Sequence, residues 1–144
     1  MTEQNFKNHA RFVPLYHYIM PLAILAFIIG SVINVFDCLH KQDCLYSASL
    51  ICLAGPVLLL LWVYSRVFAL KAQDRAIRAE ENLRHFIATG KSMDSRLRMA
   101  QIIALRFAGD DEFVALTQKA ADENMSSKDI KMAIKNWKAD NDRA

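Results

Sequence analysis

Two long stretches of the chain contain no charged side chain. No Asp, Glu, Lys or Arg lies between Arg11 and Asp37, a run of 25 residues, or between Asp43 and Arg66, a run of 22. An α-helix rises about 1.5 Å per residue and the hydrocarbon core of a bilayer is about 30 Å thick, so either stretch can cross it. Backbone groups in lipid must pair within the segment, which favours helices. We predict two membrane spans and a loop between them: 18–36, 46–64 and 37–45.

Beyond the second span, apolar residues recur three and four positions apart among charged ones, which is the spacing of one helix face. They are Phe68, Ala72, Ala76, Ala79, Leu83 and Phe86. We expect the second span to continue as one helix until Gly90, because glycine readily adopts the positive φ of a helix end. The narrow, alanine-rich stripe suits packing on the helices that follow, or association between subunits.

Three shorter helices are expected after Gly90, over about 95–108, 111–124 and from 126 onward. Each begins at a side chain that can accept a hydrogen bond from the first helical turn: Asp94, Asp110 and Ser126. The inward positions of these helices follow helical spacing and include Phe107, Phe113, Leu116, Ile130, Ile134 and Trp137. A segment of this length can bury a modest core.

Together these patterns predict an all-α membrane protein. A two-helix transmembrane hairpin carries a cytoplasmic helical tail, into which the second helix extends, and about three further short helices complete the tail. The expected divisions are an interfacial arm, the transmembrane hairpin and the cytoplasmic helical domain: 1–17, 18–65 and 66–144.

The charge distribution supports this division. The 144-residue chain has a net charge of +3, and of its 33 charged residues (18 basic, 15 acidic) 6 lie in residues 1–65 and 27 in residues 66–144. Such a separation excludes a single water-soluble core, a secreted disulfide scaffold and a disordered chain. The loop contains only Lys41, whereas several Lys and Arg residues flank the outer ends of the spans. Both termini are therefore expected in the cytoplasm, with aromatic residues such as Tyr16 and Trp62 at the membrane interface.

The N-terminal arm is polar, basic and aromatic, so we expect it along the inner headgroup layer of the membrane. Its candidate contact residues are Lys7, His9, Arg11 and His17. His17, at the edge of the first span, could relay protons or ligate a cofactor. The alternative is an interfacial histidine that hydrogen-bonds a headgroup or the backbone, since no second ligand stands at a telling spacing.

The loop between the spans holds Cys38, His40 and Cys44. If the loop lies outside the membrane in an oxidising compartment, Cys38 and Cys44 can form a disulfide. Free thiols are an alternative, and a metal site is another, although three ligands in one short loop are weak evidence for a metal. Cys52, inside the second span, is expected to be a small packing residue.

Small residues within the spans indicate close helix packing. Ala26, Gly30 and Asn34 share one face of the first span, and this face should pack on the second span or on a copy of the protein, because small residues let helices approach in lipid. Gly55 and Pro56 lie near the middle of the second span, where the missing N–H of proline predicts a kink.

Four lysines are expected on the outer face of the last helix: Lys128, Lys131, Lys135 and Lys138. Such a basic face can contact anionic lipid, a protein partner or nucleic acid. Nucleic acid is disfavoured because the sequence has no Arg- or Asn-rich recognition helix. The alternative is an ordinary solvated helix face.

Four stretches of the chain are distinctive: QNFKNHARFVPLYH, ALKAQDRAIRAEENLR, QIIALRFA and KDIKMAIKNW. Together they resemble an uncharacterised family of small two-span membrane proteins from the Bacteroidota, known as a domain of unknown function. The resemblance covers almost the whole chain and implies a bacterial inner-membrane protein. It carries no established activity, cofactor or site residue.

The sequence has no nucleotide-binding loop, nucleophile elbow, zinc-protease motif or pair of catalytic carboxylates, so we expect neither an enzyme nor a cofactor. The expected function is that of a membrane scaffold or accessory subunit. Its partners would be the lipid bilayer, further copies of itself or a larger membrane complex. The alternatives are a homo-oligomeric channel or transporter, on the strength of the small-residue face and the Gly55-Pro56 pair, and a membrane-tethered regulator that uses the basic helix face.

Overall fold

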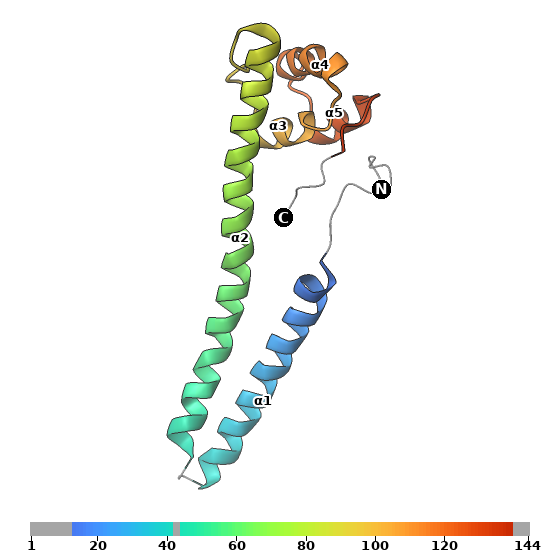
Figure 1. Cartoon of the computed structure of the whole chain (residues 1–144). Coiled ribbons are helices and arrows are strands. Elements are labelled where there is room, and N and C mark those ends of the chain that lie inside the picture. The colour runs from blue at the N-terminus through green and yellow to red at the C-terminus, as the bar shows by residue number, and fades with distance from the viewer. Residues whose placement is uncertain (1–12, 42–43, 140–144) are drawn as a thin grey trace. The chain divides into compact units, whose positions relative to one another are not determined.

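The computed structural model describes residues 13–41 and 44–139, and in those ranges every regular element is helical (Figure 1). The elements are the π-helix η1 (Leu15–Ile19), α1 (Met20–Lys41), the long α2 (Leu45–Thr89), α3 (Met99–Leu105), α4 (Asp110–Asp122) and α5 (Ser127–Ala133). The chain divides into two compact units within α2, between Phe68 and Ala69. We call the described residues before this point the pair unit and those after it the tail unit. The predicted all-helical architecture is confirmed.

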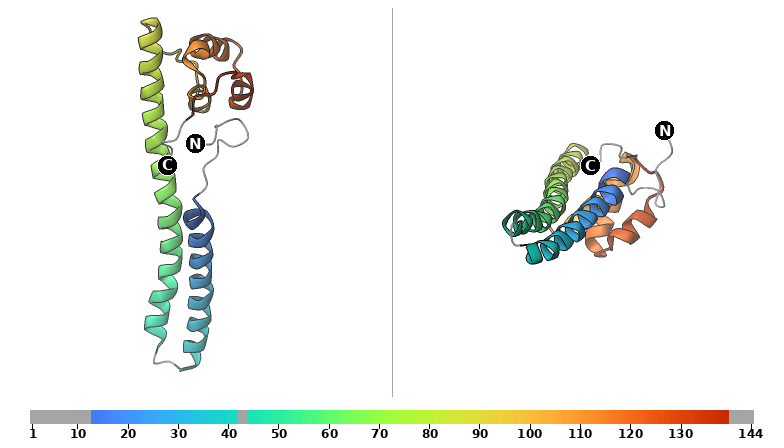
Figure 2. Two further views of the ribbon diagram at one scale, coloured as in Figure 1. Left: turned by 45° about the vertical axis from the view of Figure 1, so that its right-hand side comes forward. Right: turned by 90° about the horizontal axis from the view of Figure 1, so that it is seen from below.

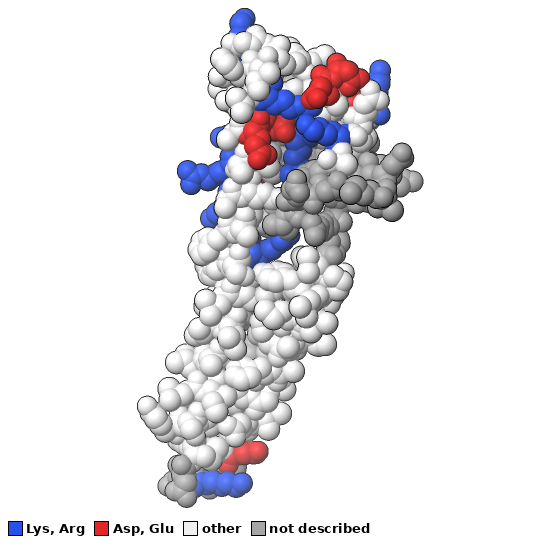
Figure 3. All heavy atoms as spheres, in the orientation of Figure 1, with Lys and Arg blue, Asp and Glu red and all other residues white. Residues whose placement is uncertain are grey.

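The pair unit exposes its apolar side chains. The helical segments Leu15–Leu39 and Leu45–Thr89 are each long and apolar enough to cross a membrane, and only 6% and 11% of their most apolar windows are buried. Leu22 and Leu61, for example, are 68% and 62% exposed. Figure 3 shows a long surface over this unit that carries charged side chains only near its ends. A soluble protein rarely presents so large an apolar surface to water.

Both helices of the pair unit extend further into the predicted loop than the apolar pattern suggests. Helix α1 continues to Lys41 and α2 begins at Leu45, so most of the expected loop at 37–45 is helical. The physical reason is local, because the segment contains no proline or glycine. A change from apolar to polar side chains does not interrupt the backbone hydrogen bonds of a helix.

Close packing between α1 and α2 occurs at Gly55 rather than at Gly30. The two helices lie side by side (Figure 2), and a Cβ atom at Gly55 would lie 2.8 Å from Cγ1 of Ile28, so a side chain there would displace Ile28. Ala26, Gly30 and Asn34 are exposed, and no atom of α2 lies within 4 Å of a Cβ placed at Gly30. The prediction that this face packs on the second span is therefore wrong, and packing on another copy stays a prediction.

Pro56 lies inside α2 and does not end it, because the helix runs without interruption from Leu45 to Thr89. The predicted kink at Gly55 and Pro56 stays a prediction. What the structure adds is a packing role for the glycine, which leaves room for Ile28 of α1.

The tail unit has a core of its own. Two phenylalanines at its centre, Phe107 and Phe113, are each 1% exposed, and Ile130 from α5 is fully buried. Helix α3 packs on both α4 and α5, and Ile77 brings α2 into the same buried cluster. The sequence pattern placed Phe107, Phe113 and Ile130 in the core, and this prediction is confirmed.

Helix α3 begins later than predicted, at Met99 instead of residue 95. Asp94, the predicted cap, closes a turn before the helix starts. Its Oδ1 accepts a hydrogen bond from the N–H of Arg96 at 2.8 Å, and its carbonyl accepts one from the N–H of Leu97 at 3.1 Å. Asp110 is likewise not a cap but the first residue of α4, since Gly109 is the N-cap.

Two other predicted helix boundaries are confirmed. Ser126 is the N-cap of α5, and its Oγ accepts a hydrogen bond from the N–H of Asp129 at 3.2 Å. Gly90 follows the end of α2 with a φ of 72°, and its N–H donates to the carbonyl of Phe86 at 2.7 Å. Both signals act over three or four residues, so the sequence shows them directly.

The apolar stripe of α2 does not face the core of the tail unit. Leu83 and Phe86 are 58% and 52% exposed, whereas Ile77 and Glu81, on another side of the helix, are buried. The prediction that the stripe packs on the following helices is therefore wrong. The buried side of α2 carries the carboxylate of Glu81 instead of the stripe. Burial of this carboxylate is tolerated because Glu81 is paired with Arg84.

Candidate interaction surface

A groove of about 870 Å³ runs along α2 in the tail unit, and we call it the α2 groove. One wall is formed by polar residues of α2, and the other by the segment from Met93 to Ile102. The charged residues of the α2 wall are Lys71, Asp74, Arg75 and Arg78. The apolar residues of the opposite wall are Met93, Leu97, Met99 and Ile102. The groove therefore combines charged and apolar contacts along its length.

The charged wall of the α2 groove is net positive, with three cations against Asp74. Within the described part of the chain, the side chains of Lys71, Arg75 and Arg78 make no hydrogen bond or ion pair. Asp94, on the opposite side, is already held by Arg96 at 2.6 Å. The groove is thus suited to an acidic ligand that also has apolar side chains.

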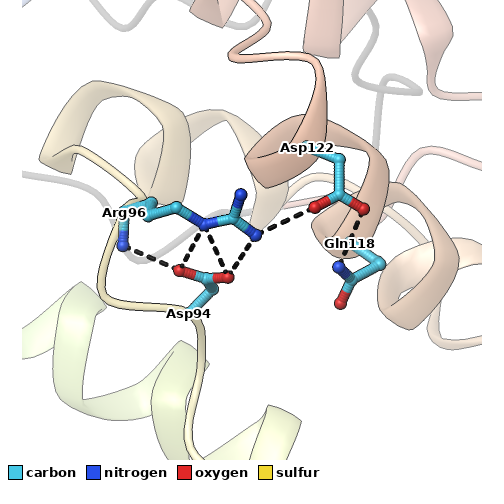
Figure 4. Close-up of polar contacts among 4 residues, drawn as sticks. All are labelled: Asp94, Arg96, Gln118 and Asp122. Atoms are coloured by element: carbon cyan, nitrogen blue, oxygen red, sulfur yellow. Dashed lines mark hydrogen bonds and ion pairs between the residues drawn. The ribbon is translucent and has the colours of Figure 1, made fainter.

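Asp94 belongs to a polar cluster that joins the turn before α3 to α4 (Figure 4). Nη2 of Arg96 lies 2.6 Å from Oδ2 of Asp94 and 2.9 Å from Oδ1 of Asp122. Nε2 of Gln118 donates to the other oxygen of Asp122 at 2.9 Å. This arrangement links residues that are far apart in sequence, so its role is to position the turn.

The hydrogen bonds of this cluster favour the ionised carboxylates. Those from the side chain and backbone of Arg96 lower the pKa of Asp94 from 3.8 to about 2. The bond from Gln118, followed by that from Arg96, lowers the pKa of Asp122. The bond to Asp94 raises the pKa of Arg96. These carboxylates are held as anions at neutral pH, which is unsuited to a general acid.

Arg84 makes the main polar connection between α2 and α4. Its Nη1 lies 3.1 Å from Oε2 of Glu81, its Nε donates to Oδ1 of Asp110 at 2.8 Å, and its Nη2 donates to the carbonyl of Ala108 at 2.7 Å. The guanidinium carbon also lies 4.0 Å from the ring centroid of Phe113. The hydrogen bond from Arg84 lowers the pKa of Asp110.

Sequence reasoning missed this connection. Arg84 pairs with Glu81, three residues earlier on α2, and with Asp110, which is 26 residues away. The spacing of Glu81 and Arg84 was a usable signal, since residues three apart are neighbours on a helix. No local signal identified Asp110.

The structure describes only one of the four candidate residues of the arm, His17. Lys7, His9 and Arg11 lie outside the described residues. Nδ1 of His17 lies 3.1 Å from the backbone N of Val13 and 2.9 Å from its carbonyl. His17 therefore contacts the backbone of Val13, four residues earlier, and its position at a membrane interface stays a prediction.

Cys38 and Cys44 are joined by a disulfide with their Cα atoms 5.4 Å apart. The metal site considered as an alternative would need the sulfur atoms of both cysteines, and the disulfide uses both of them. Among the residues that the structure describes, no group of three or more His, Cys, Asp or Glu side chains could hold a metal ion. Cys52 is a half-buried free thiol in α2.

The four C-terminal lysines do not share one helix face. Lys128 and Lys131 lie on α5, which ends at Ala133, before Lys135 and Lys138 are reached. The helix stops because the backbone N–H of Lys135 donates to the carboxylate of Glu112, 3.0 Å from Oε1, and the next N–H does the same at 2.9 Å. The prediction that the four lysines share one helix face is therefore wrong, and their contact with lipid or a partner stays a prediction.

Comparison with known proteins identifies the family of the chain and nothing more specific. No match was found among curated proteins or among solved structures. One family model matches residues 1–144, which is the whole sequence. The chain therefore belongs to the family of unknown function DUF6526.

Proposed function

We propose that this chain is a membrane-anchored scaffold or accessory subunit that acts by binding other proteins and not by catalysis. The observation that carries this proposal is the composition of α2. It is one helix of 45 residues. Its first part is apolar and exposed, and its last part contributes Ile77 and Glu81 to a folded, charged unit. Such a helix connects a membrane anchor directly to an interaction domain.

Insertion of the pair unit into lipid accounts for its exposed side chains. Full burial of a Leu, Ile or Phe side chain is favourable by about 1.5–3 kcal/mol, and most such side chains of α1 are exposed. The proposed arrangement is a transmembrane hairpin formed by α1 and the first part of α2. As the resemblance to a Bacteroidota family implies, the membrane would be a bacterial inner membrane.

The proposed topology places both termini in the cytoplasm. Arg66, Lys71 and Arg75 follow the second apolar stretch, whereas residues 37–45, between the two apolar stretches, contain Lys41 and no other Lys or Arg. Basic residues favour the cytoplasmic side. A disulfide between Cys38 and Cys44 agrees with this direction, because an external connection lies in an oxidising compartment.

The polar clusters support a scaffold role. The carboxylates of Glu81, Asp94 and Asp110 are each held by an arginine that connects two parts of the tail unit. The α2 groove is the surface that we assign to the partner. Its cations and apolar wall fit an acidic, amphipathic segment of another protein. A channel receives less support, because the glycine of the Gly55-Pro56 pair is occupied by packing against Ile28.

Membrane extraction tests the anchor. Alkaline carbonate should leave the chain in the membrane pellet, and a chain released into the supernatant would contradict the proposal. A thiol reagent that cannot cross the inner membrane should label a cysteine at position 41 (Lys41→Cys) in intact cells and fail to label one at position 91 (Lys91→Cys). Both tests use Cys52→Ala as the background.

Charge reversal tests the groove. A partner recovered with the wild-type chain in mild detergent should be lost from the double variant Lys71→Glu, Arg78→Glu. It should be retained by Lys128→Glu, which makes the same kind of charge change on α5, outside the groove. Recovery of the same partners from all three proteins would exclude the groove as the binding site.

A further inference from the structure

The exposed side of α2 in the tail unit carries six small or apolar residues that we call the alanine stripe: Ala69, Ala72, Ala76, Ala79, Leu83 and Phe86. All six are exposed. Successive residues of an α-helix are turned by about 100°, so the centre of the stripe lies on the side opposite to Ile77 and Glu81. Those two residues are buried in the tail unit. No helix of the described chain therefore lies over the centre of the stripe, although Ala79 and the neighbouring Arg75 also line the α2 groove.

The spacing within the alanine stripe alternates between three and four residues without interruption. This is the a and d pattern of a heptad, with Ala69, Ala76 and Leu83 at a and the other three at d. A single helix lying on a globular core has a broader apolar face. Alanine at most of these positions allows two helix axes to approach closely. The pattern therefore suits a partner helix of the same kind.

The charges beside the alanine stripe are complementary between two copies of the chain. Arg75 occupies a g position and Glu80 an e position, so they lie on opposite flanks. In a parallel pair of helices, a g residue meets the e residue five positions later on the partner helix. Arg75 of one copy would then meet Glu80 of the other, and twofold symmetry would form this contact twice. Both residues are exposed, and within the described part of the chain neither forms an ion pair.

We propose that a second copy of this chain packs on the alanine stripe, in parallel and in register over residues 69–86. The proposal rests on the membrane topology proposed above, because anchoring in one membrane gives both copies the same direction. The contact spans about 27 Å of helix, which is short for chains that are free in solution. Anchoring in the same membrane raises the effective concentration of the two helices.

Cysteine cross-linking in carbonate-washed membranes tests the arrangement. In the Cys52→Ala background, the single variants Ala69→Cys, Ala76→Cys and Leu83→Cys should each form a covalent dimer with a short thiol cross-linker. Ala88→Cys is the matched control, because Ala88 is exposed on the same helix and lies outside the stripe, and it should remain monomeric, like the background. Cross-linking at only one of the three positions would indicate antiparallel helices and overturn the proposal, as would no cross-linking at all.

Charge exchange tests the register. Arg75→Glu and Glu80→Arg should each reduce cross-linking at position 76, by about fivefold if two exposed ion pairs are lost. Combining them should restore it. Lys91→Glu makes the same charge change beyond the end of the alanine stripe and outside the α2 groove, so it should leave cross-linking unchanged. A combined variant that stays as weak as the single variants would overturn the parallel register.

The two proposals fail in different ways. A chain that carbonate releases from the membrane contradicts the membrane scaffold. A chain that stays in the membrane, but gives no dimer at the three stripe positions, contradicts only the parallel contact.

Discussion

Tyr16 and Trp62 exchange hydrogen bonds between side chain and backbone in both directions. The hydroxyl of Tyr16 donates to the carbonyl of Trp62 at 2.7 Å, and Nε1 of Trp62 donates to the carbonyl of Tyr16 at 3.2 Å. Their ring centroids are 5.7 Å apart. This reciprocal contact joins the start of the first apolar helix to the second.

The carbonyl of Tyr16 needs this partner because of Pro21. In the π-helix η1, the N–H of Met20 donates to the carbonyl of Leu15, five residues earlier. The next bond in this series would run from residue 21 to Tyr16, but proline has no N–H to donate. The indole N–H of Trp62 supplies the missing donor.

Replacing Trp62 should therefore weaken the pair unit. We expect Trp62→Phe to lower the free energy of unfolding by about 1–2 kcal/mol, because a carbonyl loses its donor in a poorly hydrated place. Thermal unfolding in mild detergent, followed by circular dichroism, measures this effect. Tyr64→Phe is the control, since its ring stacks on Phe68 and keeps that contact. Equal melting temperatures for wild type and Trp62→Phe would contradict the role assigned to the indole.

Removing Arg84 should destabilise the tail unit more than removing another arginine of α2. Arg84→Ala leaves the buried carboxylate of Glu81 without its partner, and we expect a loss of about 2–3 kcal/mol in the free energy of unfolding. Arg78→Ala should change it by about 0.5 kcal/mol or less, because that side chain is exposed. Denaturant unfolding of both variants gives the comparison. Similar losses for the two would show that the polar connection to Asp110 adds little.

Gly55 and Gly30 should respond differently to the same substitution. Gly55→Leu inserts a side chain whose Cβ would lie 2.8 Å from Cγ1 of Ile28, and we expect a loss of about 1–3 kcal/mol from overpacking. Gly30→Leu, on the exposed side of α1, should leave the stability of the isolated chain unchanged or slightly higher. Unfolding by increasing amounts of SDS compares the stability of the two variants. A greater loss for Gly30→Leu would reverse the assignment of the packing face.

Acid should destabilise the tail unit through its carboxylates. The pKa of Asp94 is lowered to about 2, and those of Asp110 and Asp122 are also lowered. Because the folded state binds these protons less tightly than the unfolded state, the stabilisation is complete above about pH 4 and is lost as the pH falls toward 2. Urea midpoints measured at several pH values should fall over this range. Asp94→Asn should flatten the dependence, and an unchanged slope would contradict the role of its carboxylate.

Features that depend on neighbouring residues could be predicted from the amino-acid sequence alone. The two uncharged stretches predicted the apolar helices, Gly90 predicted the end of α2, and Ser126 predicted the start of α5. Each of these signals is complete within a few residues or within one helix. The segment between the two apolar helices was less well predicted, because the end of an apolar run is not the end of a helix, and α1 continues to Lys41.

Which side of each helix is covered depends on contacts that form in the folded chain between residues far apart in sequence. The apolar stripe of α2 was expected either against the following helices or between subunits. In the tail unit Glu81 is buried instead, because its partner Arg84 also bonds to Asp110 and to the carbonyl of Ala108. The predicted lysine face is interrupted in the same way. The carboxylate of Glu112 accepts a hydrogen bond from the backbone N–H of Lys135, which lies beyond the end of α5. These partners lie more than 20 residues away in sequence. A local pattern of apolar residues carries no information about them, so it identifies a helix and leaves open which face packs.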